Sequence, residues 1–198
     1  MFSGKSTELK RKNDIFKACG KRTQVFKKRD DNRFKDIKIV THSGLGFKEL
    51  YAVKDVDEIE KNIKPDTDVI LIDEAQFFSS KLYDKVRSWI KGNPKKNIIA
   101  RSVVLTLLPS DANGNPFPFI DKKRNVGDLL AIADFITQCN SKCRFQFEDG
   151  SYCHADATTT FRTSCSKKLI DIGGADKYIA LCRKHFNEMQ LRKKLEKK

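Results

Sequence analysis

The chain has 198 residues, of which 39% are hydrophobic and 33% charged, and its formal net charge is +14. The apolar fraction suffices for a sizeable core and excludes a purely disordered chain, while no stretch approaches the ~20 apolar residues of a membrane span. We interpret the scattered lysines mainly as a feature of solubility, and expect no membrane or nucleic-acid partner. The first segment is charged by residue 5 and does not resemble a secretory signal, so we expect a cytoplasmic protein with cysteines present as thiols or metal ligands.

The chain opens on MFSGKST at residues 1–7, which is the second half of a phosphate-binding loop. The complete motif, G-x-x-x-x-G-K-[ST], lies between a buried strand and a helix. Gly4 allows close approach of the backbone to a phosphate, Lys5 reaches the β- and γ-phosphates, and the Ser6 hydroxyl is placed for Mg²⁺. The first glycine and its strand would precede Met1, so we expect a nucleotide site whose first strand is missing.

Two elements are expected directly after this loop. Apolar residues at helical spacing predict a helix over about residues 6–19, which Gly20 ends. Strands are expected at 22–26 and, after a polar turn, at 37–40.

The middle of the chain predicts a buried parallel sheet. The continuous apolar run at 69–72 is typical of a central strand buried on both faces. A helix follows, ends at 92–94, and precedes another buried strand at 103–108; its apolar face is formed by Leu82, Val86, Trp89 and Ile90. Strands that alternate with helices indicate an α/β fold with a parallel sheet.

The cysteines define a second unit, because five of the six lie between Cys139 and Cys182. We therefore expect a nucleotide-binding domain over 1–128, a small domain over 129–190 and a basic tail over 191–198.

Two acids follow the central strand. Because strand ends line the nucleotide crevice of such folds, Asp73 suits the acid that orients Mg²⁺. Glu74 could accept a proton from an attacking hydroxyl. The alternative is an acidic strand-to-helix turn that serves as a cap.

The cysteine-rich region also suits a structural zinc site, which takes four nitrogen or sulfur ligands in two close pairs. Cys182-x-x-His185 is a credible second pair. The first pair remains open among Cys139, Cys143, Cys153 and Cys165, and these thiols could instead be small buried hydrophobic groups.

Several motifs together resemble the type II thymidine kinases. They are MFSGKSTEL at 1–9, D-x-R-F at 31–34, T-H-x-G at 41–44, DEAQFF at 73–78, IGGADKY at 172–178 and CRKH at 182–185. They occur in that family's order and cover nearly the whole chain.

The resemblance implies a P-loop nucleoside triphosphatase-type domain followed by a zinc-bearing lasso domain, in a homotetramer. The implied reaction moves the γ-phosphate of ATP to the 5′-hydroxyl of thymidine or deoxyuridine. It implies that Asp73 serves Mg²⁺ and that Glu74 is the catalytic base. The ATP and Mg²⁺ residues of the loop would be Ser3, Gly4, Lys5, Ser6 and Thr7.

For the nucleoside, the resemblance implies an aromatic pocket walled by Phe77, Phe117 and Tyr178. Main-chain contacts to the base would come from Ile172, Gly173 and Gly174. We expect Phe78 to be a core residue.

The resemblance also selects zinc ligands. It places Cys143 and Cys153 on the first pair, with residues 144–152 as an insertion between them, and Cys182 and His185 on the second pair. Cys139 and Cys165 are alternatives.

Two other functions stay open. Ala112 stands where the family carries an aromatic residue and the first strand is missing, so the chain could be a catalytically impaired, truncated relative. It could also be a basic zinc-containing nucleic-acid binder.

Overall fold

The computed structural model describes residues 3–29, 47, 49–164 and 177–195. The chain divides into two compact units, which we describe separately. The sheet unit comprises residues 5–108 and 118–133, and the cysteine unit comprises residues 1–4, 109–117 and 134–198. The strand expected at 37–40 lies outside the described residues.

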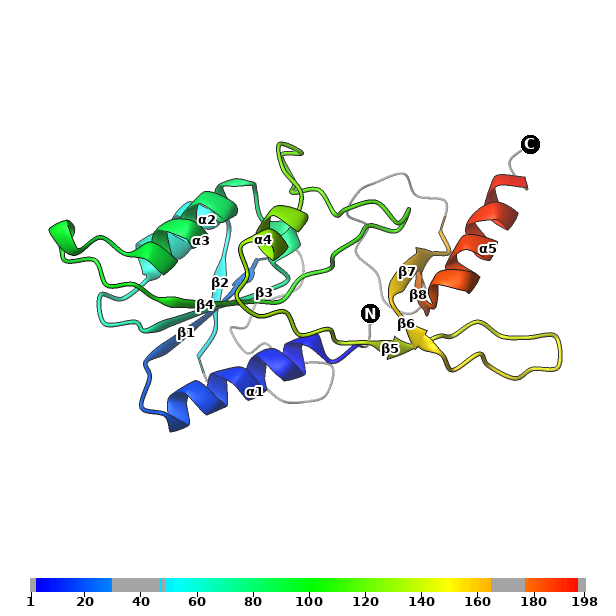
Figure 1. The fold of residues 1–198 in the computed structure, drawn as a ribbon, viewed down its shortest axis with the longest axis horizontal. Helices are drawn as coiled ribbons and strands as arrows, with labels where there is room; N and C mark the ends of the chain where they lie inside the picture. The colour runs from blue at the N-terminus through cyan, green and yellow to red at the C-terminus, as the bar shows by residue number, and fades with distance from the viewer. Residues whose placement is uncertain (1–2, 30–46, 48, 165–176, 196–198) are drawn as a thin grey trace. The chain divides into compact units, whose positions relative to one another are not determined.

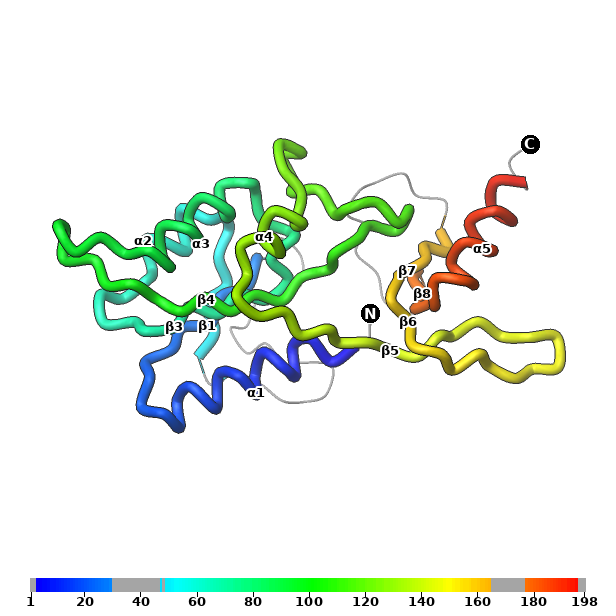
Figure 2. Tube along the Cα trace, viewed as in Figure 1, coloured from blue at the N-terminus to red at the C-terminus, as the bar shows by residue number. Residues whose placement is uncertain are grey.

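The sheet unit is built on a parallel four-stranded sheet in the order β2-β1-β3-β4. Its strands are β1 (Thr23–Lys28), β2 (Tyr51–Val53), β3 (Val69–Asp73) and β4 (Ser102–Leu105). Strands β1 and β3 are neighbours in the sheet although β2 lies between them in the chain (Figure 2). The predicted α/β class with a parallel sheet is therefore confirmed.

Helices cover both faces of this sheet. Helix α1 (Lys5–Ala18) lies on one face, and α2 (Val56–Asn62) and α3 (Lys81–Lys91) lie on the other (Figure 1). The remaining helical segments among the described residues of the sheet unit are short: η1 (Ala75–Phe77), η2 (Pro94–Lys96) and α4 (Gly127–Ala131). The predicted helix at 6–19 and the predicted strands at 22–26 and 69–72 are confirmed within two residues at each end.

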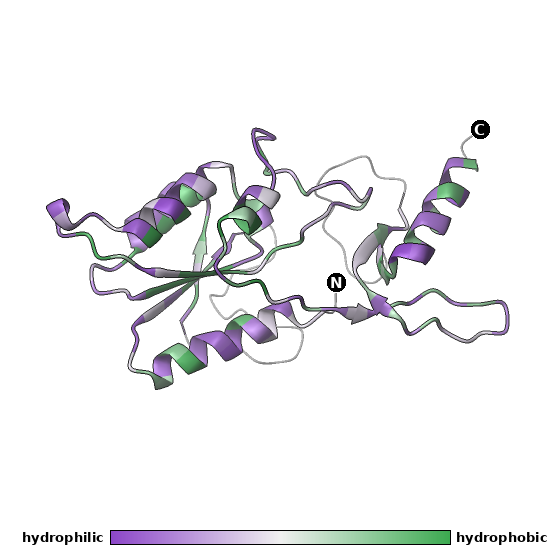
Figure 3. Cartoon of the chain, viewed as in Figure 1, coloured by the Kyte–Doolittle hydropathy of each residue, from purple (hydrophilic) through white to green (hydrophobic). Residues whose placement is uncertain are grey.

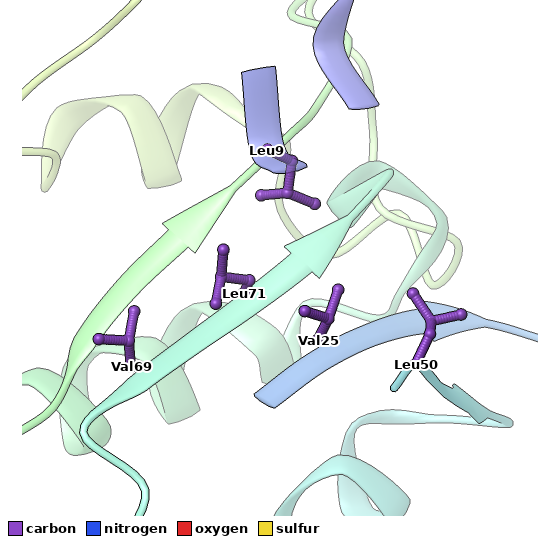
Figure 4. Close-up of a cluster of buried hydrophobic side chains, with 5 residues drawn as sticks. All are labelled: Leu9, Val25, Leu50, Val69 and Leu71. Carbon is purple, nitrogen blue, oxygen red and sulfur yellow. The ribbon is translucent and has the colours of Figure 1, made fainter. Parts of the chain in front are cut away.

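Alternate side chains of a strand point to the same face of the sheet. Those on the face covered by α1 form a hydrophobic core with this helix. It consists of Leu9, Val25, Leu50, Val69 and Leu71, all buried (Figure 4). Every residue of β3 is buried, as expected for a strand covered on both faces. Figure 3 shows hydrophobic residues along the strands at the centre of the sheet and many hydrophilic residues on the helices to either side.

Two predictions are wrong: the extent and burial of strand β4, and the burial of Ile90 in α3. Strand β4 ends at Leu105 instead of residue 108, and Val103 to Leu105 are half-buried, because β4 is an edge strand among the residues that the structure describes. Ile90, predicted on the apolar face of α3, is 41% exposed. Leu82, Val86 and Trp89 form the buried face without it.

Gly92 ends α3, as predicted, with φ of 62°. A Cβ atom at this position would lie 2.6 Å from the backbone nitrogen of Ala100, so the space is closed to any side chain. The positive φ and the close approach both require glycine here.

The described residues of the cysteine unit form two small antiparallel pairs and one helix. Strand β5 (Ser141–Lys142) pairs with β6 (Asp156–Ala157), and β7 (Thr159–Arg162) pairs with β8 (Tyr178–Leu181). Helix α5 (Arg183–Leu195) follows β8 directly. Its buried core is small and includes a thiol: Cys143, Phe161, Leu181 and Phe186.

No helix in the described parts of the chain has the length and apolar character needed to cross a membrane.

Asp121 caps the N-terminus of α3 from a distant loop. Its carboxylate accepts hydrogen bonds from the Ser80 backbone N–H (3.1 Å) and hydroxyl (2.7 Å). Burial alone would raise the pKa of Asp121, but the hydrogen bonds from Ser80 and from the backbone N–H of Lys123, together with the Lys123 charge, outweigh it and hold this pKa below its ordinary value. We expect Asp121→Ala to lower the free energy of unfolding by about 1 kcal/mol at neutral pH, measured by urea denaturation.

The pH dependence of this effect has a defined sign. A carboxyl group whose pKa is lower in the folded chain stabilises it above the unfolded pKa, and this stabilisation disappears as pH falls through the folded pKa. The difference between wild type and Asp121→Ala should therefore shrink below about pH 4. Asp121→Asn, which keeps an oxygen acceptor without the charge, should lose less stability at pH 7. Equal stability of wild type and Asp121→Ala at pH 7 would contradict this account of the cap.

Candidate active site and candidate metal centre

The carboxyl end of β3 carries the candidate active site. Asp73 is the last residue of β3 and is only 3% exposed. The Ser6 hydroxyl, in the first turn of α1, lies 3.2 Å from one oxygen of this carboxylate and 3.3 Å from the other. The phosphate-loop residues and the strand-end acid, 67 positions apart in the chain, thus meet at one point.

Two lysines approach the two acids of this site. Lys27 lies opposite Asp73 in the register of β1 and β3, and its Nζ is 3.5 Å from the Asp73 carboxylate. The Nζ of Lys5 lies 3.9 Å from the Glu74 carboxylate. The site therefore combines two ammonium groups, two carboxylates and a hydroxyl, which is a donor set suited to binding phosphate and a hard cation.

Glu74 is held in an unusual backbone conformation. Its φ of 54° and ψ of 52° lie in the left-handed region, which costs a non-glycine residue roughly 1–2 kcal/mol. The amide of Gln76 donates to the Glu74 carboxylate at 2.5 Å, and the amide oxygen of Gln76 accepts from the backbone N–H of Leu108. Gln76 is fully buried, so it fixes the direction of a carboxylate that is itself partly open to solvent.

The other expected residues of the loop lie next to this group in sequence. Gly4 precedes α1 with φ of 77°, a conformation that favours glycine, and Thr7 lies exposed in the first turn. Ser3 is half-buried.

The expected nucleoside residues are distributed over both units. Phe77 lies half-buried in η1 of the sheet unit, three residues after Glu74, whereas Phe117 and Tyr178 belong to the cysteine unit. Phe117 is 6% exposed. Ile172, Gly173 and Gly174 lie outside the described residues. Phe78 is completely buried, which confirms its expected place in the core.

Four side chains of the cysteine unit form a candidate metal centre. The ligand atoms of Cys143, Cys153, Cys182 and His185 all lie within 4.8 Å of one another. His185 Nδ1 is 3.6 Å from the sulfur of Cys143 and 3.3 Å from that of Cys182. These four residues are the set that the resemblance selects. Cys139 is described and is not part of the group, and Cys165 lies outside the described residues.

A hairpin explains how Cys143 and Cys153 meet despite nine intervening residues. The backbone N–H of Cys153 donates to the carbonyl of Phe145 at 3.0 Å, and Gln146 forms a bridge with Tyr152. Gly150, with φ of 84°, lies in the turn. The antiparallel pairing brings the two thiols to the base of the hairpin, so the loose spacing in sequence becomes a close pair in space.

The donor set fits zinc. In tetrahedral zinc sites the metal lies about 2.3 Å from sulfur and about 2.05 Å from nitrogen, so a sulfur and a nitrogen ligand lie about 3.6 Å apart. The distances from His185 Nδ1 to the sulfurs of Cys143 and Cys182 are close to this value. Burial raises the pKa of the Cys143 thiol. Burial acts in the same direction on Cys182, but hydrogen bonds from the backbone of His185 and from Cys143 prevail and lower the pKa of Cys182.

Aromatic rings surround the histidine of this centre. The Phe145 ring stacks on the His185 imidazole with centroids 4.0 Å apart and planes 5° apart, and Phe147 meets it edge-on. These rings fix the orientation of the imidazole and limit its access to water. They belong to the segment 144–152 that the sequence singled out as an insertion.

Three residues around the active site were not singled out from the sequence. Gln76 lies within the quoted motif but received no role, and Lys27 is one of many lysines in the sequence. Thr106 could have been noticed as the one polar residue of the apolar run at 103–108. Its contacts with the β3 end are non-local, and spacing along the chain does not reveal them.

A parallel sheet with a helix-start lysine and hydroxyl beside two strand-end acids is typical of P-loop phosphotransferases. The family model described as thymidine kinase matches residues 1–186. Curated thymidine kinases of Choristoneura fumiferana and Choristoneura biennis entomopoxviruses are each 35% identical over 95% of this chain and 92% of their own length. That of Amsacta moorei entomopoxvirus is 32% identical over 94% of this chain and 93% of its own length. The chain belongs to the thymidine kinase family.

The comparisons do not favour the alternative of a catalytically impaired relative, since each of these relatives carries the name thymidine kinase. The family assignment likewise favours a kinase over a zinc-containing nucleic-acid binder.

Replacement of a thiol tests the metal centre. We expect wild-type protein to retain about one zinc ion per chain after gel filtration, and Cys143→Ser to retain far less, because a hydroxyl is a poor zinc ligand. Zinc is measured by atomic emission. Cys139→Ser is the matched control and should retain its zinc. Loss of zinc from Cys139→Ser with retention in Cys143→Ser would show that the ligand set is different.

Proposed function

We propose that this thymidine kinase family member transfers the γ-phosphate of ATP to the 5′-hydroxyl of thymidine, and also of deoxyuridine, in pyrimidine salvage. The observation that carries this proposal is the meeting of Lys5, Ser6, Asp73 and Glu74 at the carboxyl end of β3. Ligands of open α/β sheets bind at this end of the strands. The family match gives the nucleoside.

The chemistry is an in-line displacement. The Glu74 carboxylate accepts the proton of the thymidine 5′-hydroxyl, and the oxygen attacks the γ-phosphorus of ATP. The bond from the γ-phosphorus to the β–γ bridging oxygen breaks, and ADP leaves with the electron pair. The left-handed turn at Glu74 and the hydrogen bond from Gln76 hold the carboxylate for this task before substrates arrive.

The phosphates would be held by the loop that opens the chain. In this proposal Gly4 and the N–H groups at the start of α1 cradle the phosphates, with Ser3 and Thr7 beside them. Lys5 and Lys27 place positive charge where negative charge develops during transfer. Bound Mg²⁺ would neutralise the β- and γ-phosphate oxygens, with Asp73 and the Ser6 hydroxyl as its protein contacts.

The nucleoside would bind against aromatic side chains. We assign Phe77, Phe117 and Tyr178 to the walls of this pocket because flat rings stack well on a pyrimidine. Main-chain groups of Ile172, Gly173 and Gly174 would contact the base, as the resemblance to type II thymidine kinases implies. The same resemblance leads us to propose a homotetramer in the cytoplasm, with zinc bound by Cys143, Cys153, Cys182 and His185.

Neutralisation of the proposed base tests the mechanism. Glu74→Gln keeps the size and hydrogen-bonding capacity of the side chain but cannot accept the proton. We expect kcat to fall by about 10²- to 10⁴-fold with a small change in the KM for thymidine. The measurement is thymidine-dependent release of ADP. Glu188→Gln, which makes the same change in α5, serves as the control and should keep the wild-type rate. A wild-type rate in Glu74→Gln would contradict the assignment of the base.

A further inference from the structure

Thr106 follows β4 and makes four hydrogen bonds with the end of β3. Its backbone N–H donates to the carbonyl of Ile72 at 2.9 Å, and its own carbonyl accepts from the N–H of Ala75 at 2.7 Å. Its hydroxyl donates to the Asp73 carboxylate at 2.6 Å and accepts from the N–H of Glu74 at 2.9 Å. One residue therefore contacts all four positions from 72 to 75.

The two hydroxyl contacts join the two acids of the proposed active site. A threonine hydroxyl has one proton to donate and lone pairs to accept, and here both capacities are used. Thr106 is buried, and a β-branched side chain has a stiff χ1, so the hydroxyl has little freedom to leave this position. The distance and direction between the Asp73 carboxylate and the Glu74 backbone are thereby fixed.

The contact to Glu74 matters because of the strained backbone there. A left-handed residue other than glycine persists only where its surroundings hold it. The Glu74 N–H would lose its acceptor without the Thr106 hydroxyl, while the backbone bonds at Ile72 and Ala75 would remain. Loss of the hydroxyl should therefore loosen the turn that carries Glu74 without separating β4 from β3.

We infer that Thr106 is a positioning residue for phosphoryl transfer: its hydroxyl sets Asp73 and Glu74 relative to each other. The inference rests on the proposed function, in which these two acids act on ATP and thymidine. Thr106 acts through its neighbours and is not itself placed at the reacting atoms.

The test compares Thr106→Val, which replaces only the hydroxyl by a methyl group, with Thr106→Ser, which keeps it. We expect kcat of Thr106→Val to fall about 10- to 100-fold, with the KM for thymidine changed by less than about threefold. Thr106→Ser should stay within about threefold of the wild-type kcat. If Thr106→Val does not fold, Thr106→Ala takes its place with the same expectation.

Thr67→Val is the matched control. Thr67 is buried just before the other end of β3, and its hydroxyl bonds the Gln24 side chain. This variant loses a buried hydroxyl in the same unit, so its melting temperature should fall much as that of Thr106→Val does. Its kcat should stay at the wild-type value, since Thr67 does not contact the two acids.

A second readout does not depend on catalysis. Amide hydrogen exchange of Glu74, followed by NMR, should accelerate about tenfold in Thr106→Val and stay close to wild type in Thr106→Ser and Thr67→Val. A wild-type kcat in Thr106→Val, an equal loss in Thr106→Ser, or unchanged exchange at Glu74 would each overturn the inference. If the wild type proves inactive on thymidine, the proposed function fails, whereas the exchange experiment still decides whether Thr106 holds the turn.

Discussion

The buried carboxylate of Asp73 is the constraint on which the arrangement of the sheet unit depends. A buried charge is costly unless it is paired and hydrogen-bonded, and Asp73 meets this condition through three elements. Ser6 reaches it from α1, Lys27 from β1, and Thr106 from the residue after β4. Such buried pairs add little net stability, but they are satisfied in only one geometry. The charge thereby places the phosphate-loop residues, the neighbouring lysine and Glu74 at one point.

The central strand and the position of the two acids could be predicted from the sequence, because the motifs that indicate them are short and local. The apolar run at 69–72 defined a buried strand, and the rule that ligands bind at strand ends then brought Asp73 and Glu74 to the glycine-lysine-serine loop. The features that the sequence did not predict depend on contacts between residues far apart in the chain. The left-handed turn at Glu74 and the role of Thr106 exist only because β4 lies beside β3. The half-exposed state of β4 likewise depends on sheet order, which an apolar run does not reveal.

The cysteine unit shows the same division between local and non-local signals. Cys182 and His185 have the spacing of a zinc pair, and the beginning of α5 holds them 3.3 Å apart. Cys143 and Cys153 have no such spacing, and only the hairpin between them makes them neighbours. The residues of that hairpin also supply Phe145, whose ring covers His185. A segment that resembles a plain insertion in the sequence therefore contributes the surroundings of the candidate metal centre.

The central claim is that the carboxyl end of β3 performs phosphoryl transfer, with Glu74 as the base. It is tested most directly by a crystal structure of the protein with thymidine, Mg²⁺ and a non-hydrolysable ATP analogue. The account predicts the Glu74 carboxylate within about 3.2 Å of the 5′-hydroxyl, and Asp73 and Ser6 beside the metal ion. A 5′-hydroxyl bound away from Glu74, or phosphates bound away from Lys5 and Ser6, would contradict it.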